Sequence, residues 1–118
     1  MAMPKSVSLA AVAIAALTLT AGIAAAKEPV LWNLTVNRID SLKISPPGKN
    51  AWSAEQTLND KDHSVDPDER LKITGIADGV YDVKFVDAKK RTCIVPNVAL
   101  AANKITSIDE KELKGCTP

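Results

Sequence analysis

Apolar and polar residues alternate in two short segments, as they do in strands that bury one face. In residues 70–74 (RLKIT), Leu71 and Ile73 point to one side. In residues 80–87 (VYDVKFVD), the apolar side consists of Tyr81, Val83 and Phe85, while Asp82 and Lys84 point outward. Turn residues (Gly75, Asp78 and Gly79) separate the two segments, and this arrangement predicts a hairpin.

Further strands are expected in segments rich in β-branched and aromatic residues. These segments are 30–36, 39–45, 92–95, 98–100 and 104–108. Pro96 and Asn97 interrupt the third and fourth of them, which predicts an edge strand with a bulge. Residues 109–113 are expected to form a single helical turn.

The predicted strands and turns define the fold class. About five to seven short strands, with a turn every ten residues or so, predict an all-β fold: a small antiparallel β-sandwich or barrel. No internal repeat divides residues 27–118, and their number suits a single domain.

The N-terminal segment has a different pattern. Lys5 is followed by an uncharged apolar run over 7–23 and then by Ala24, Ala25 and Ala26. This order predicts a cleavable secretory signal peptide over 1–26, with export to the periplasm or the extracellular space. The alternative is a membrane anchor, but the run is at the lower limit for a bilayer span. The Ala-rich leader is typical of bacteria.

Charge limits the partners of the exported part. Without Lys5, the chain has fourteen basic and fourteen acidic side chains. A net charge of zero argues against nucleic acid and against an anionic membrane surface as partners.

Cys93 and Cys116 are the chain's two cysteines, with 22 residues between them. In an exported chain an even number of cysteines predicts a disulfide. Two free thiols, a redox pair and half of a metal site are the alternatives. A redox pair usually has closer spacing, and zinc needs more ligands than one histidine adds.

A pattern across residues 30–100 resembles a group of small exported bacterial proteins, mostly uncharacterised, some of them labelled Tat-signal-domain proteins. The pattern reads N-x-T, I-x-x-L-x-I-S-P-x-G, W, L and Y-D-V. The resemblance implies an all-β domain and names no active site. The matching residues are Asn33, Thr35, Ile39, Leu42, Ile44, Ser45, Pro46, Gly48, Trp52, Leu58, Tyr81, Asp82 and Val83.

Residues 59–69 (NDKDHSVDPDE), here called the acidic loop, carry the strongest hint of chemistry. Calcium prefers six to eight oxygen ligands, and carboxylates at alternate positions of a short loop can surround it. The spacing partly matches EF-hand and shorter calcium motifs, but their glycine is absent. The alternative is a solvated polar loop. The candidate ligands are Asp60, Asp62, Ser64, Asp66, Asp68 and Glu69.

Catalysis has little support in the sequence. His63 and Ser64 are adjacent in the acidic loop, but a nucleophilic site needs a base oriented by a third group and an oxyanion pocket. Recognised hydrolase, metalloprotease and phosphate-loop motifs are absent from the chain. We therefore expect no enzyme and no catalytic residues.

Three smaller features have ordinary structural interpretations. Trp32 and Trp52 suit a binding platform for sugar or peptide, but core or strand packing is the preferred interpretation. Residues 89–91 (KKR) fit a charged turn. Asn33-Leu34-Thr35 is a glycosylation sequon only in a eukaryotic secretory route.

The sequence thus predicts an exported binding or structural module for an unknown protein or small-molecule ligand. A calcium-dependent module that uses the acidic loop is the second hypothesis, and a small secreted enzyme is the third.

Overall fold

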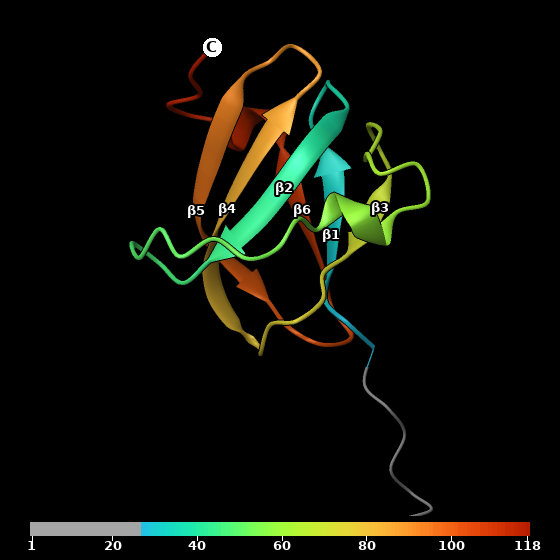
Figure 1. Cartoon of the computed structure of the whole chain (residues 1–118), viewed down its shortest axis with the longest axis vertical. Helices are drawn as coiled ribbons and strands as arrows, with labels where there is room; N and C mark the ends of the chain where they lie inside the picture. The colour runs from blue at the N-terminus through green and yellow to red at the C-terminus, as the bar shows by residue number, and fades with distance from the viewer. Residues whose placement is uncertain (1–26) are drawn as a thin grey trace, which may run out of the picture.

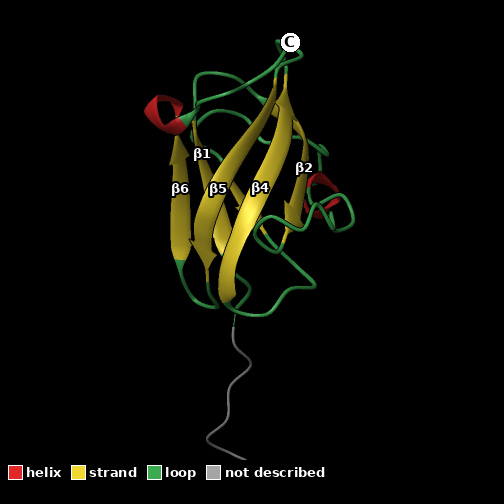
Figure 2. Cartoon of the chain, turned by 90° about the vertical axis from the view of Figure 1, so that its left-hand side faces the viewer, coloured by secondary structure: helices red, strands yellow, loops and turns green. Residues whose placement is uncertain are grey.

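A computed structural model describes residues 27–118, which form two three-stranded sheets enclosing one core (Figure 1). The first sheet has the order β3-β1-β6, with β1 (Val30–Leu34), β3 (Arg70–Lys72) and β6 (Ile105–Asp109). The second has the order β2-β4-β5, with β2 (Ile39–Ser45), β4 (Gly79–Asp87) and β5 (Thr92–Leu100). Two 3₁₀ turns, η1 (Thr57–Asn59) and η2 (Glu110–Glu112), lie beside the sheets (Figure 2). The all-β prediction is confirmed.

The core follows the alternation of the strands. Ile73, Val83 and Phe85 have no solvent-exposed surface, and Leu71 is 3% exposed. Tyr81 packs at the margin of this core, and its hydroxyl donates a hydrogen bond to the Ala77 carbonyl at 2.6 Å. Burial of one face of each strand against the opposite sheet is the main source of stability in such a domain.

The first sheet is mixed rather than purely antiparallel. β1 pairs with β3 antiparallel and with β6 parallel, so strands from opposite ends of the described chain are neighbours. The predicted hairpin is wrong, because β3 and β4 belong to different sheets. The Ile73 amide donates to the Pro29 carbonyl at 2.8 Å, which keeps the end of β3 beside β1. Turn residues favour a change of direction but do not choose the strand's partner.

The predicted edge strand and bulge are confirmed in β5. Tyr81 pairs with Val98 and Val83 pairs with Val95, so two β5 residues oppose Asp82. One of those two is Asn97, with a φ of 56°. Asparagine tolerates this left-handed conformation better than most residues.

The predicted disulfide between Cys93 and Cys116 is confirmed, with a Cα–Cα distance of 4.2 Å. It fastens the C-terminal tail, residues 113–118, to the outer edge of β5. Thr92 and Thr117 exchange two backbone hydrogen bonds of 2.7 and 2.9 Å beside it. A structural disulfide of this kind belongs to an oxidising environment outside the cytoplasm.

The outer edge of β2 is covered by residues 46–56, here called the covering loop. Its Ser53 and Gln56 amides donate to the Ile44 and Leu42 carbonyls, both at 2.8 Å. The Glu55 carboxylate accepts hydrogen bonds from β2 and from η1. Leu42 and Ile44 therefore direct their backbone groups away from β4 and toward the loop.

The predicted signal peptide, residues 1–26, lies outside the described residues. Within residues 27–118, no helix has the length and apolar character needed to cross a bilayer.

Candidate functional site

The acidic loop folds into two consecutive tight turns. Asp60 begins the first turn: its carboxylate accepts a hydrogen bond from the Asp62 amide at 2.9 Å. Glu69 closes the second, because its carboxylate accepts from the Asp66 amide at 2.7 Å. Between the turns, the Val65 side chain enters the core at 2% exposure. The loop is therefore fixed at its middle by an apolar anchor.

The Glu69 carboxyl lies near the carboxyls of two other predicted calcium ligands, Asp60 and Asp66. The backbone hydrogen bond from Asp66 lowers the pKa of Glu69, but loss of solvation and the adjacent Asp60 carboxyl raise it by more. The net effect is a raised pKa for Glu69. Two carboxylates close together disfavour double ionisation.

The side chains of the remaining predicted ligands do not join Asp60 and Glu69 in a metal-ligating group. Asp62 and Asp66 are exposed, Ser64 is half-buried, and Asp68 turns toward β1. His63 is exposed, with a φ of 58°. Within residues 27–118, no three carboxylate, histidine or cysteine side chains are grouped as a metal site would require. Calcium binding by the acidic loop stays a prediction.

Trp32 is half-buried on the solvent-facing side of β1, outside the hydrophobic core. Its indole Nε1 donates to the Asp68 carbonyl at 3.1 Å and to the Asp68 carboxylate at 3.0 Å. The Arg70 guanidinium lies 4.6 Å from the ring centroid. Of the two expected roles of Trp32, packing in the core is wrong and packing along the strand is confirmed: hydrogen bonds and a cation–π contact hold its ring on the outer face.

Strand pairing builds an apolar surface around Trp32, here called the Trp32 face. Val30 and Leu34 are half-exposed and lie on either side of the ring along β1. Ile105 pairs with Val30 across the sheet and is 53% exposed. Arg70 borders the ring on β3, opposite Trp32 in the register. The outer side of the first sheet thus presents an aromatic ring within an apolar row that has a cation at its edge.

Trp52 lies on the opposite side of the molecule. It belongs to the covering loop, and its ring centroid is 4.5 Å from the Lys84 ammonium. Lys84 faces outward from β4, because its neighbours Val83 and Phe85 fill the core. The two tryptophans therefore lie over different sheets and do not form a common platform.

Two lysines that the sequence did not single out as a site are paired across the second sheet, and one of them, Lys84, contacts Trp52. Lys43 of β2 is the direct cross-strand partner of Lys84 of β4. The alternating pattern places each of them outward, but only the pairing of β2 with β4 brings them together.

Two buried polar groups serve the fold. Asn33 is 3% exposed and donates to the Asn37 and Val65 carbonyls at 3.0 and 2.9 Å, so its sequon is closed to glycosylation. Asp87 is 1% exposed and accepts hydrogen bonds from the Lys89 and Arg91 amides at 2.9 and 3.0 Å. These contacts form the turn between β4 and β5, as the charged segment 89–91 predicted.

No known protein family, curated protein or solved structure matches this chain.

Proposed function

We propose that the protein is an exported binding module whose ligand site is the Trp32 face. The observation that carries the proposal is the ring of Trp32, held on a solvent-facing sheet by Asp68 and Arg70. A fixed aromatic ring loses little conformational entropy when a ligand stacks on it. Tryptophan and arginine are also the side chains most enriched at binding hot spots.

The size of the Trp32 face favours a small ligand or one extended segment. Three strands spaced about 4.8 Å apart, two of five residues and one of three at about 3.3 Å each, cover roughly 200 Å². A stable interface between two copies of a protein buries about 800 Å² on each partner. A sugar chain or a short peptide therefore fits this face better than a second copy of the domain.

The test is capture of a ligand from a bacterial envelope extract by immobilised residues 27–118. Trp32→Ala is expected to weaken capture by about 2 kcal/mol, or roughly thirtyfold, the scale of a hot-spot tryptophan. Leu58→Ala is the control, because it removes an apolar side chain that is 60% exposed and belongs to neither proposed surface. Equal capture by the two variants, with both still folded by circular dichroism, would contradict the proposal.

Export is part of the same proposal. The disulfide and the signal-like segment 1–26 support it. The intact mass of the exported protein is expected to correspond to a chain that starts at Lys27. A membrane-retained form that keeps residues 1–26 would contradict export with cleavage.

A second proposal is that the acidic loop binds calcium between Asp60 and Glu69. The approach of these two carboxyls favours it, because a bound cation would offset the repulsion that raises the pKa of Glu69. For a weak site with Kd about 10⁻³ M, about 10 mM calcium stabilises the fold by about 1.4 kcal/mol. Glu69→Gln is expected to abolish the corresponding rise in Tm, and the same concentration of magnesium to give less. A calcium response unchanged in Glu69→Gln would exclude this pair.

A further inference from the structure

Lys43 and Lys84 form a like-charged pair at the centre of the second sheet. Leu42 and Ile44 direct their backbone groups to the covering loop, so Lys43 exchanges its backbone hydrogen bonds with Lys84. Their Cβ atoms are thus about 5.5 Å apart, and like charges at this distance destabilise a sheet. The pair needs a compensating group or a function.

Neighbouring carboxylates do not supply that compensation. Within residues 27–118, no carboxylate oxygen lies within 4.0 Å of either ammonium group, the distance that defines the three ion pairs of this structure. Glu55 is occupied by hydrogen bonds from Ser41 and Thr57. Asp82 accepts from the Gly48 amide at 2.9 Å and the Asn97 amide at 3.4 Å. The nearby acids are therefore committed to the backbone and to hydroxyl groups.

Trp52 is positioned against Lys84 of this pair by its own loop. The Ala51 amide donates to the Ser45 hydroxyl at 2.9 Å, and the Ser53 amide donates to the Ile44 carbonyl at 2.8 Å. These bonds fix the backbone on both sides of Trp52 and hold its ring 4.5 Å from the Lys84 ammonium. The Trp52 ring and the Lys84 ammonium are thus presented together, beside the paired Lys43, on one solvent-facing sheet.

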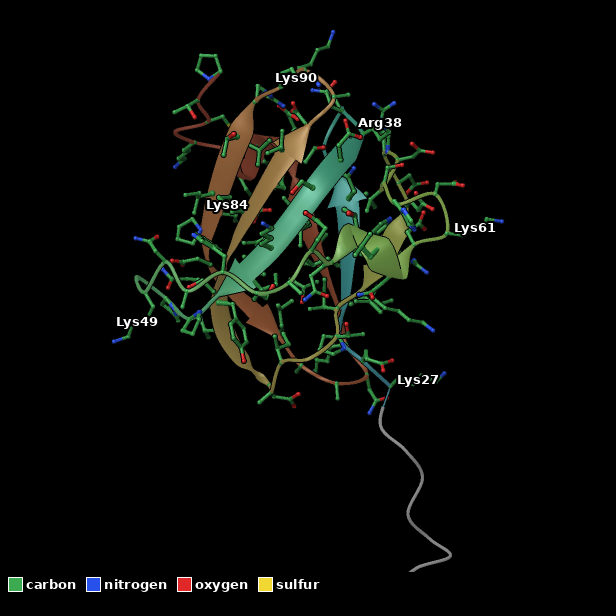
Figure 3. All side chains as sticks on the ribbon, in the orientation of Figure 1. Lys27, Arg38, Lys49, Lys61, Lys84 and Lys90 are labelled. Carbon is green, nitrogen blue, oxygen red and sulfur yellow. A yellow bond between two sulfur atoms is a disulfide. The ribbon has the colours of Figure 1, made fainter. Side chains whose placement is uncertain are left out.

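The same surface continues across β5. Ile94 pairs with Lys84 and is 43% exposed. A shallow groove beyond it is lined by Ile94, Pro96, Lys111 and Lys114, with Glu112 as its acidic member. Positive charge and apolar surface therefore alternate from β2 to the C-terminal segment, and Figure 3 shows Lys84 near the middle of this sheet.

We propose that the surface formed by Lys43, Lys84, Trp52 and Ile94 binds a carboxylate-bearing polysaccharide, a site distinct from the Trp32 face. A uronic-acid residue carries one carboxylate for the ammonium pair and an apolar C–H face for the Trp52 ring. Ammonium groups bind anions as point charges, which suits single carboxylates spaced along a sugar chain. A polyphosphate or nucleic acid would be attracted through an excess of basic charge, and residues 27–118 have none.

The experiment is isothermal titration of residues 27–118 with polygalacturonate oligomers at low ionic strength. The double variant Lys43→Gln/Lys84→Gln is expected to weaken binding by at least about tenfold, because charge-assisted hydrogen bonds to the carboxylate are lost. Trp52→Ala is expected to weaken it by a similar factor. Leu58→Ala removes an exposed apolar side chain outside both proposed surfaces and is expected to bind like the unmodified chain.

Lys61→Gln/Lys90→Gln is the matched charge control, since these lysines lie in loops at the rim of the molecule (Figure 3). It makes the same change in net charge and is expected to leave binding within about twofold. Three results would overturn the proposal: no binding of polygalacturonate, equal weakening by this control, or polygalacturonate bound as tightly by Trp52→Ala as by the unmodified chain. The last result would mean that charge alone determines binding.

Discussion

At the residue scale, Asp87 shows how one buried carboxylate holds a turn. Burial alone would raise its pKa, but hydrogen bonds from the Arg91 amide and guanidinium and from the Lys89 amide lower the pKa by more. The Arg91 Nε lies 2.8 Å from the carboxylate, and the Asp87 side chain is 1% exposed. Such an acceptor stabilises the fold only while it is ionised.

Asp87→Asn is expected to lower the free energy of unfolding by about 2–4 kcal/mol at pH 7, because one charged acceptor of several donors is lost. With its folded pKa lowered, Asp87 contributes stability above its unfolded pKa of about 3.9 and loses it as pH falls below that value. The difference between the two proteins should therefore shrink toward pH 3 in urea denaturation. Asp40→Asn, which breaks the exposed pair with Arg38, should cost less than about 1 kcal/mol.

Glu69 should have the opposite pH dependence. Its pKa is raised in the folded state, so the folded protein holds this proton more tightly than the unfolded chain. Stability from this group is present in acid and is lost as pH rises from about 4.3 through the folded pKa. Glu69→Gln keeps an acceptor for the Asp66 amide, and at pH 7 it is expected to be more stable by less than about 1 kcal/mol.

Thermal melting of the Glu69→Gln variant at pH 4 and pH 7, without calcium, checks this expectation. Asp62→Asn removes a charge from the same loop at an exposed position and should change the melting midpoint little at either pH. A Glu69→Gln variant that is less stable than the unmodified chain at pH 7 would show that its hydrogen bond outweighs the repulsion from Asp60.

At the scale of elements, the exposed edges of the second sheet are protected in different ways. The covering loop bonds along β2. On β5, Thr117 pairs with Thr92, Pro96 has no amide to donate, and the Thr106 hydroxyl donates to the Ala99 carbonyl at 2.7 Å. These devices block pairing with a second chain, which an open edge would invite. The disulfide fastens the C-terminal tail that carries Thr117.

The double variant Cys93→Ala/Cys116→Ala is expected to lose about 2–4 kcal/mol of unfolding free energy. Release of the tail also uncovers the backbone of β5 at Thr92, so we expect the variant to associate at concentrations where the unmodified chain is monomeric. Urea denaturation and light scattering measure the two effects. Thr117→Pro is the control that removes one edge hydrogen bond and keeps the disulfide. If the double cysteine variant associates and Thr117→Pro does not, the disulfide is what protects the edge of β5.

At the scale of the whole molecule, strands distant in sequence complete one core. Parallel pairing of β1 with β6 joins residues separated by more than half of the chain. Ile108 of β6 is 2% exposed and packs in the same cluster as Leu31 of β1. The first sheet therefore cannot be completed until the C-terminal strand is in place.

Truncation after residue 103 is expected to abolish cooperative unfolding, because it uncovers β1 and removes Ile108 and the disulfide together. Circular dichroism during heating measures this loss. Truncation after Gly115, with Cys93→Ala, removes the disulfide but keeps β6, and it should retain a cooperative transition at a lower temperature. A cooperative transition in the shorter chain would show that β6 is dispensable.

Local patterns determined the strands, the inward side chains, the β5 bulge and the disulfide. Alternation at Val83 and Phe85 determines which face of the strand is buried. Pro96 and Asn97 restrict the backbone locally, and this restriction predicts the bulge. With two cysteines in an oxidising compartment, each has one possible intramolecular partner, so the disulfide pairing is determined. All these features depend on residues near one another in sequence or on simple pairing.

Tertiary structure alone decided which strands are neighbours and therefore which side chains meet. The hairpin expected between β3 and β4 was wrong. Leu71 and Ile73 are buried with β3 paired to β1, so their apolar character does not require pairing with β4. Core packing and strand packing were both open for Trp32, and the register places it beside Arg70 on the outer face. Lys43 and Lys84 meet only because β2 pairs with β4. Alternation fixes the face on which a side chain lies, whereas its neighbours on that face depend on long-range pairing.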